Sequence, residues 1–174
     1  MPDHDPLDQF LRYAADKLEQ NLAQVTRAVG LLTVDEFWHR PNPHTNSVAN
    51  LLLHLNGNVR QWIVAGIGDE PFERNRPAEF AERGPLPVSA LLSPLQHTVA
   101  RAVAVLKTLN PGNLATPRRI QDYEISTLTA VFHVVEHFSF HTGQIVHATK
   151  WLRDVDLSLY DAQGHKLAGQ TGGP

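Results

Sequence analysis

The sequence predicts an all-α protein, a four-helix bundle with a long crossover loop between its second and third helices. Apolar residues recur at helical spacing in four long segments, three of which follow a common helix-capping residue. An apolar content of 42% is typical of a globular core. The 174 residues have the size of one domain. We therefore expect a single domain at 1–174, with a core at about 5–153 and a tail at 154–174.

The first helix is predicted to begin after Asp5, with Pro6 in its first turn, and to end near Leu32. Thr33 and Glu36 then have the spacing of a capping box. This pair predicts one short helical turn, which nearby prolines would stop.

The second and third helices are separated by the longest connection in the chain. Asn46 or Ser47 could cap the second helix, whose apolar face continues up to Gly66 and Gly68. Residues 69–87 mix charges with prolines and show no sustained periodicity, which indicates a crossover loop. The third helix is expected at 88–109, with Pro94 causing a kink or a late start.

The fourth helix is expected to start at a cap formed by Ser126 or Thr127 and to end near residue 152. The stretch 113–124 before it is polar, and we predict neither a helix nor a strand there. Residues 157–167 could form a weak hairpin or simply a tail.

Composition excludes several classes of function. The formal charge is −3 and the basic residues are scattered, so neither nucleic acid nor an anionic membrane is expected as a partner. Without cysteine, any metal must bind to nitrogen or oxygen ligands. No apolar run approaches the roughly 20 residues that span a bilayer, and the first residues lack a signal-peptide pattern. We therefore expect a cytoplasmic protein.

Histidine is the one unusual feature of the composition, with ten residues in all. His133, His137 and His141 are each four apart, so they lie on one face of the predicted fourth helix. His54 lies among leucines in the middle of the second helix, where a polar group needs a partner. We predict a metal site formed by His54, His137 and His141. For His54 alone, an ordinary core histidine would be the better interpretation.

Three further residues are candidates for hydrogen bonds to the ligands or to a bound species. His133 is predicted to contact the metal ligands without binding the ion itself. The alternatives that it is a fourth ligand or an ordinary core residue stay open. Asn58 lies one turn after His54, and Gln144 lies one turn after His141. Alternatively, Asn58 and Gln144 are simply amides on the surface of their helices.

The strings that carry these histidines resemble the DinB/YfiT-like metalloenzyme superfamily over about residues 5–160. The resemblance is strongest to a DinB-related subgroup of unknown function. It rests on His54-Leu-Asn-Gly-Asn-Val-Arg-Gln-Trp62, Glu79-Phe80, His137 to Gln144 with its His-Thr-Gly-Gln, and Thr149-Lys150. The resemblance implies a four-helix bundle, often a homodimer, with nickel or zinc held at His54, His137 and His141. Many members have an arginine at the position of Thr142. The anion contact that such an arginine would make is therefore not expected in this chain.

Three neutral histidines leave a tetrahedral ion one open position, as in catalytic sites. The first functional hypothesis is therefore a divalent-metal-dependent enzyme with a small-molecule substrate. Transferase or hydrolase chemistry on a small molecule or a thiol adduct would follow. The alternative is a non-catalytic, metal-stabilised binding or interaction module, or a bundle with a vestigial site. An open position that faces a cavity of about 300 Å³ or more would favour the enzyme.

Overall fold

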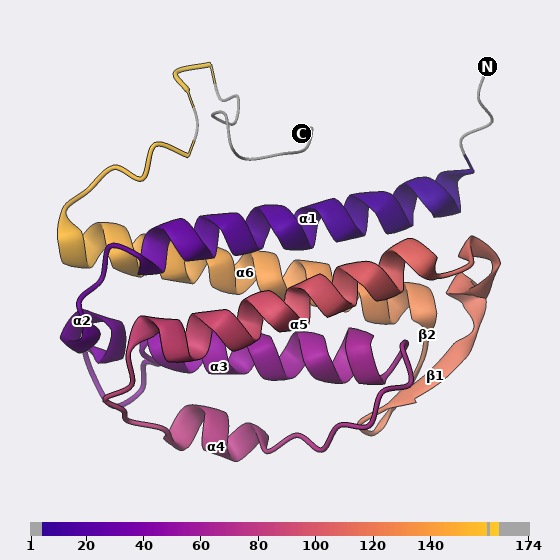
Figure 1. Cartoon of the computed structure of the whole chain (residues 1–174), viewed down its shortest axis with the longest axis horizontal. Coiled ribbons are helices and arrows are strands. Elements are labelled where there is room, and N and C mark those ends of the chain that lie inside the picture. The colour runs from indigo at the N-terminus through magenta and orange to yellow at the C-terminus, as the bar shows by residue number, and fades with distance from the viewer. Residues whose placement is uncertain (1–4, 160, 164–174) are drawn as a thin grey trace.

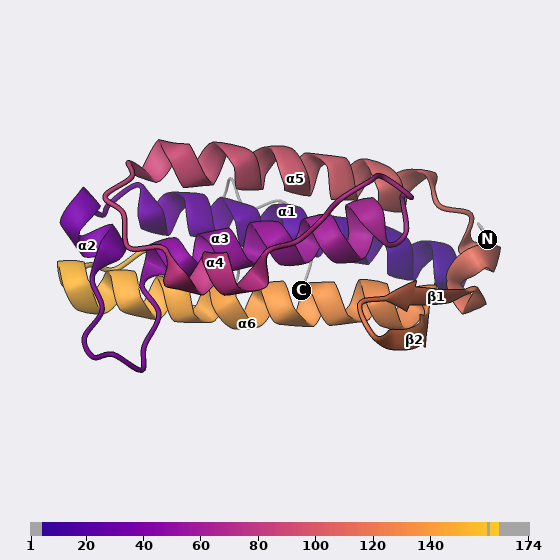
Figure 2. The ribbon, with the colours of Figure 1, turned by 90° about the horizontal axis from the view of Figure 1, so that it is seen from below.

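The computed structural model describes residues 5–159 and 161–163, and this part of the chain is mostly helical (Figure 1). Its four long helices lie side by side along the long axis of the molecule (Figures 1 and 2). They are α1 (Pro6–Val29), α3 (Val48–Val59), α5 (Val88–Thr108) and α6 (Thr127–Arg153). Helix α1 contacts α5 and α6, and α3 contacts the same two helices. The predicted all-α class is thus confirmed as a mostly helical chain.

The helices begin where the local sequence satisfies their free backbone N–H groups. Asp5 accepts a hydrogen bond from the N–H of Leu7, and Ser47 and Asn50 form a reciprocal capping box at α3. Ser126 caps α6. Of the alternatives in the sequence, Ser47 and Ser126 are therefore the capping residues.

Short elements join the long helices. The predicted turn after Thr33 is α2 (Val34–Trp38), and it has the expected capping box. A π-helical segment, η1 (Arg60–Ala65), continues α3. A 3-10 turn, η2 (Pro111–Ala115), follows α5.

The structure corrects three details of the sequence prediction. The stretch 69–87 is not only a loop, because it contains α4 (Arg76–Ala81), which is capped by Asn75. Helix α5 begins at Val88 with Pro94 inside it, so this proline does not delay its start. The polar stretch before α6 contains a hairpin of β1 (Pro117–Ile120) and β2 (Tyr123–Ser126), paired antiparallel. In the tail, residues 155–159 and 161–163 include no strand, and the rest of the proposed hairpin at 157–167 lies outside the described residues.

One apolar core lies between the four long helices. Phe138 of α6 is fully buried with Leu52 and Leu55 of α3, and Leu18 of α1 and Leu95 of α5 are equally enclosed. Burying each such side chain contributes about 1.5–3 kcal/mol. Along the described part of the chain, no helix is long and apolar enough to span a membrane.

Candidate metal centre

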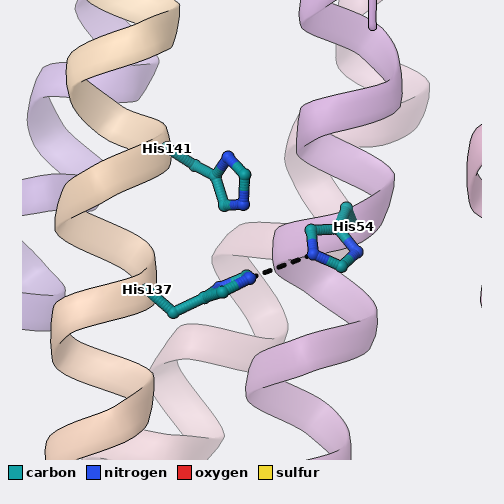
Figure 3. Close-up of side chains that lie close together, drawn as sticks. All are labelled: His54, His137 and His141. Atoms are coloured by element: carbon teal, nitrogen blue, oxygen red, sulfur yellow. Dashed lines mark hydrogen bonds between the residues drawn. The ribbon is translucent and has the colours of Figure 1, made fainter.

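The three histidines predicted as ligands lie together between α3 and α6 (Figure 3). Each offers one ring nitrogen, and these three atoms lie within 4.8 Å of one another. Nε2 of His54 is 3.0 Å from Nε2 of His137. Two nitrogen ligands at about 2.0–2.1 Å from a tetrahedral ion are about 3.3–3.4 Å apart. The His54–His137 pair is close to this separation, and the three histidines together could hold one metal ion once their rings adjust around it.

His54 is oriented by Glu79, a residue of α4. The His54 side chain is buried, and its Nδ1 lies 2.9 Å from Oε2 of Glu79. Because an ionised carboxylate only accepts hydrogen bonds, we assign the ring proton to Nδ1. The lone pair of Nε2 then faces His137, as metal binding requires.

Glu79 is itself fixed by Arg74. Nε of Arg74 donates to Oε1 at 2.6 Å, and Nη2 donates to Oε2 at 2.8 Å. Nη2 is also 3.1 Å from Nδ1 of His54, but both groups carry protons, so Glu79 is the shared acceptor. Burial would raise the pKa of Glu79, but hydrogen bonds from Arg74 and His54 outweigh it and hold this pKa below its usual value. Glu79 is therefore a carboxylate at neutral pH.

The approach of this ion pair to α3 requires a glycine. A Cβ atom at position 57 would overlap Oε1 of Glu79 and would lie 2.8 Å from Nε of Arg74. Gly57 therefore leaves the space in which Arg74 and Glu79 reach His54.

His141 is oriented by Gln144, one turn further along α6. Nδ1 of His141 donates to Oε1 of Gln144 at 2.7 Å, with the proton assigned from this contact. The Nε2 atom of His141 is then the one that can bind a metal. Gln144 thus makes the type of contact predicted for it, although its effect on metal binding is untested.

Three histidines of α6, His133, His137 and His141, are neutral at pH 7. Burial, followed by the charges of His141, His54, His133 and Arg74, lowers the pKa of His137 to about 3. Burial also lowers the pKa values of His141 and His133. Neutral imidazole is the form that binds metal ions.

Two buried polar atoms at the site have no hydrogen-bond partner among the described residues. They are Nδ1 of His137 and Oδ1 of Asn58. Buried polar atoms are nearly always paired, so water or a ligand is expected to contact them. Asn58 was predicted to form hydrogen bonds that support the histidines. The structure places it beside them, but its Oδ1 accepts no hydrogen bond from a described residue.

His133 makes ring contacts at the edge of the site. Its ring centroid is 4.3 Å from that of Trp62 and 5.6 Å from that of His137. The structure thus brings His133 next to the three histidines, and its supporting role stays a prediction.

Cavities open on two sides of the three histidines. One of about 690 Å³ is bordered by His54 and His137, and by Arg76 and Tyr123 at the α4 and hairpin side. Another of about 510 Å³ is bordered by His141 and lies near α2. The group is therefore accessible to a small molecule.

Sequence reasoning missed Glu79, Gln121 and Tyr123 as residues of the site. Asn75 followed by Pro77 is a helix-start signal that could have located α4, and with it Glu79. Arg74 and Arg76, in the stretch 69–87, both line the larger cavity. No local pattern indicated the hairpin, whose strands have four residues each.

The sequence profile of a family described as "Protein of unknown function (DUF1572)" matches residues 6–161. No curated protein shows significant similarity to the sequence. The structure is similar to the crystal structure of a conserved protein from Enterococcus faecalis, with a TM-score of 0.58 and 19% sequence identity. The match covers 89% of this chain and 99% of that protein. At this identity, the likeness supports the fold and no activity.

Proposed function

The chain belongs to the DUF1572 family, whose function is unknown, and we propose that it is a metal-dependent enzyme acting on a small molecule. We further propose that it is a four-helix bundle of the DinB/YfiT-like superfamily. The contacts of α1 and α3 with both α5 and α6 support the bundle. His54 on α3, with His137 and His141 on α6, has the arrangement that the sequence resemblance implies.

One observation carries the proposal: three histidine ring nitrogens converge beside an open cavity. Three nitrogen ligands leave a tetrahedral ion one free position, which is typical of catalytic sites and unlike closed structural ones. The cavity of about 690 Å³ has the size of ordinary small-molecule sites. A purely metal-stabilised module, the alternative, would be expected to have a closed and dry site. We propose zinc or nickel as the ion.

The chain's own residues would prepare the site for chemistry. A divalent ion held by the three histidines would supply a Lewis acid for transferase or hydrolase chemistry, including chemistry on a thiol adduct. Glu79 and Gln144 hold His54 and His141 in the tautomers that leave Nε2 free. Asn58 lines the cavity, and its buried Oδ1, which has no partner among the described residues, is an acceptor that we propose orients a bound molecule.

Metal analysis and an activity screen test this function together. Untagged protein should contain or take up about one divalent ion per chain. The loaded protein should then be screened with thiol cosubstrates and with hydrolase substrates, against the chelated protein and a His137→Ala variant. Activity that needs both the ion and His137 is the expected result. A bound ion without any activity in the screen would favour the binding module, and no bound ion would reject both. Homodimer formation and a cytoplasmic location stay predictions of the sequence.

A further inference from the structure

We infer that the cavity between α3, α4, the hairpin and α6 binds a small molecule with an anionic carboxylate or phosphate group, which Arg76 recognises. This inference names the substrate class of the same site, and it rests on the proposed function for the view that the cavity is a substrate site.

The charges around the cavity are unbalanced. Two arginines line it, Arg74 and Arg76, and none of the lining residues that the structure describes is an aspartate or a glutamate. Arg74 is neutralised by its two hydrogen bonds to Glu79. Arg76 is therefore the lining arginine whose charge no carboxylate offsets among the described residues.

Arg76 is exposed and has no carboxylate partner within 4 Å among the described residues. Its guanidinium lies over the ring of Phe80, 5.0 Å from the centroid. The ring of Phe80 in turn lies against that of His54, with 4.7 Å between centroids. The stacking leaves the donors of Arg76 free for a ligand, in a cavity that His54 and His137 also line. A planar guanidinium binds carboxylate and phosphate oxygens through paired hydrogen bonds.

Two further features of the cavity describe the rest of the ligand. Asn58 is 3% exposed, and its Oδ1 has no donor among the described residues, so the ligand should offer a hydroxyl or an amine. Trp62 and Tyr123 border the cavity with their ring centroids 6.1 Å apart, and they provide an apolar wall. An exposed arginine alone would be ordinary surface. Beside an unpaired buried acceptor and an aromatic wall, it completes a binding site for a polar anion.

Three matched probes test the inference. Phenyllactate carries a carboxylate, a hydroxyl and a ring, phenyllactamide is its neutral analogue, and 1-hydroxy-2-phenylethylphosphonate, a phosphate mimic, replaces the carboxylate with a phosphonate. Each is titrated into the chelated and the zinc-loaded wild-type protein by calorimetry. The same titrations are made with Arg76→Gln and Arg76→Lys. Arg119→Gln is the matched control, because Arg119 is an exposed arginine of β1 outside the cavity lining.

We expect at least one anion to bind more tightly than the amide in the chelated protein. Arg76→Gln should weaken anion binding about tenfold or more, Arg76→Lys should weaken it less, and Arg119→Gln should leave it unchanged. Which anion binds better distinguishes a carboxylate from a phosphate ligand. Binding of the amide should be the same in all variants.

Three results would overturn the inference. They are no anion binding by wild type at millimolar concentration, an anion preference that Arg76→Gln leaves intact, and an anion effect confined to the zinc-loaded protein. The last would place the anion on the ion instead of on Arg76. Zinc affinity, measured in parallel, should be the same in wild type and Arg76→Gln. Zinc binding without an Arg76 effect would therefore reject this inference alone, and failure of zinc binding would reject the proposed function.

Discussion

Glu79 accepts the Nδ1 proton of His54 across 2.9 Å, although the two residues lie on different helices and 25 positions apart. This contact couples the short helix α4 to the candidate metal centre. It fixes the tautomer of His54 while Arg74 keeps Glu79 ionised. Carboxylate partners of this kind orient histidine ligands and raise their basicity.

The first prediction concerns this carboxylate. Glu79→Ala removes the acceptor for His54, so zinc affinity should fall by about 10- to 100-fold. Competition with a fluorescent chelator measures the change. Glu73→Gln, an exposed change in the same segment, should have no effect. Because Glu79→Ala also leaves Arg74 unpaired, an Arg74→Ala/Glu79→Ala double variant is needed. Wild-type affinity in that double variant would contradict the orienting role of Glu79.

The second prediction concerns the three histidines themselves. His54→Ala, His137→Ala and His141→Ala should each remove most of the zinc affinity, because each takes away one of three nitrogens. His133→Ala should cause a smaller loss, of about 10-fold, since its contacts are with rings beside the site. His147→Ala, at an exposed position of α6, serves as the control. Equal affinities across the whole series would reject the assignment.

The third prediction concerns Gln144. Gln144→Ala takes away the acceptor for Nδ1 of His141, so the ring can rotate or change tautomer. We expect zinc affinity to fall by about tenfold, and Gln144→Glu to retain it because a carboxylate also accepts the proton. Gln96→Ala on the exposed side of α5 should bind zinc as wild type does. If Gln144→Glu lowered zinc affinity as much as Gln144→Ala does, residue 144 would not act by accepting the Nδ1 proton of His141.

The predictable part of this protein is the part that local sequence determines. Helical periodicity and capping residues such as Ser47 and Ser126 located the long helices, because both act within a few residues. The spacing of His137 and His141 placed them on one face for the same reason. The position of His54 among leucines then indicated that it faces the core.

The rest depends on how distant segments meet. Helix α4 has six residues, too few to show an apolar period. Its pairing with α3 depends on the space beside Gly57, which no local rule predicts. The two strands of the hairpin are also short, with four residues each. At the turn between them, Nε2 of Gln121 donates a hydrogen bond to Oε1 of Gln61 at 2.6 Å. Such contacts follow from tertiary packing.

The fourth prediction is a pH dependence of stability in the metal-free protein. An unfolded histidine titrates near pH 6.5, while the pKa of His137 in the folded chain is about 3, chiefly through burial. Between these values the unfolded state binds more protons, so stability is retained above about pH 6.5 and falls as pH falls toward 3. Each such proton contributes a slope of about 1.4 kcal/mol per pH unit.

Urea unfolding between about pH 7 and pH 5, where few carboxylates titrate, measures this slope. His137→Gln should make it shallower, because the glutamine has no proton to bind. His97→Gln, at an exposed position of α5, is the matched control. Identical slopes in wild type and His137→Gln would mean that burial does not depress the pKa of His137.

The last prediction is that the protein folds without metal. The core residues Leu18, Leu52, Leu95 and Phe138 are enclosed by packing between helices, independently of any ion. All three rings also have partners without metal, because His54 bonds to Glu79 and to His137, and His141 bonds to Gln144. The chelated protein should therefore be strongly helical and unfold cooperatively.

Circular dichroism and thermal melting test this directly. Zinc should raise the stability of wild type by about 2.7 kcal/mol at a free concentration of 100 times the dissociation constant, because it binds only the folded state. Alanine at positions 54, 137 and 141 together should remove this increase while the metal-free melting curve stays cooperative. If chelation instead produced an unfolded chain, the ion would be a structural one that folding requires. The proposed function would then lose its main physical support, since a site that serves folding has no need of a free coordination position.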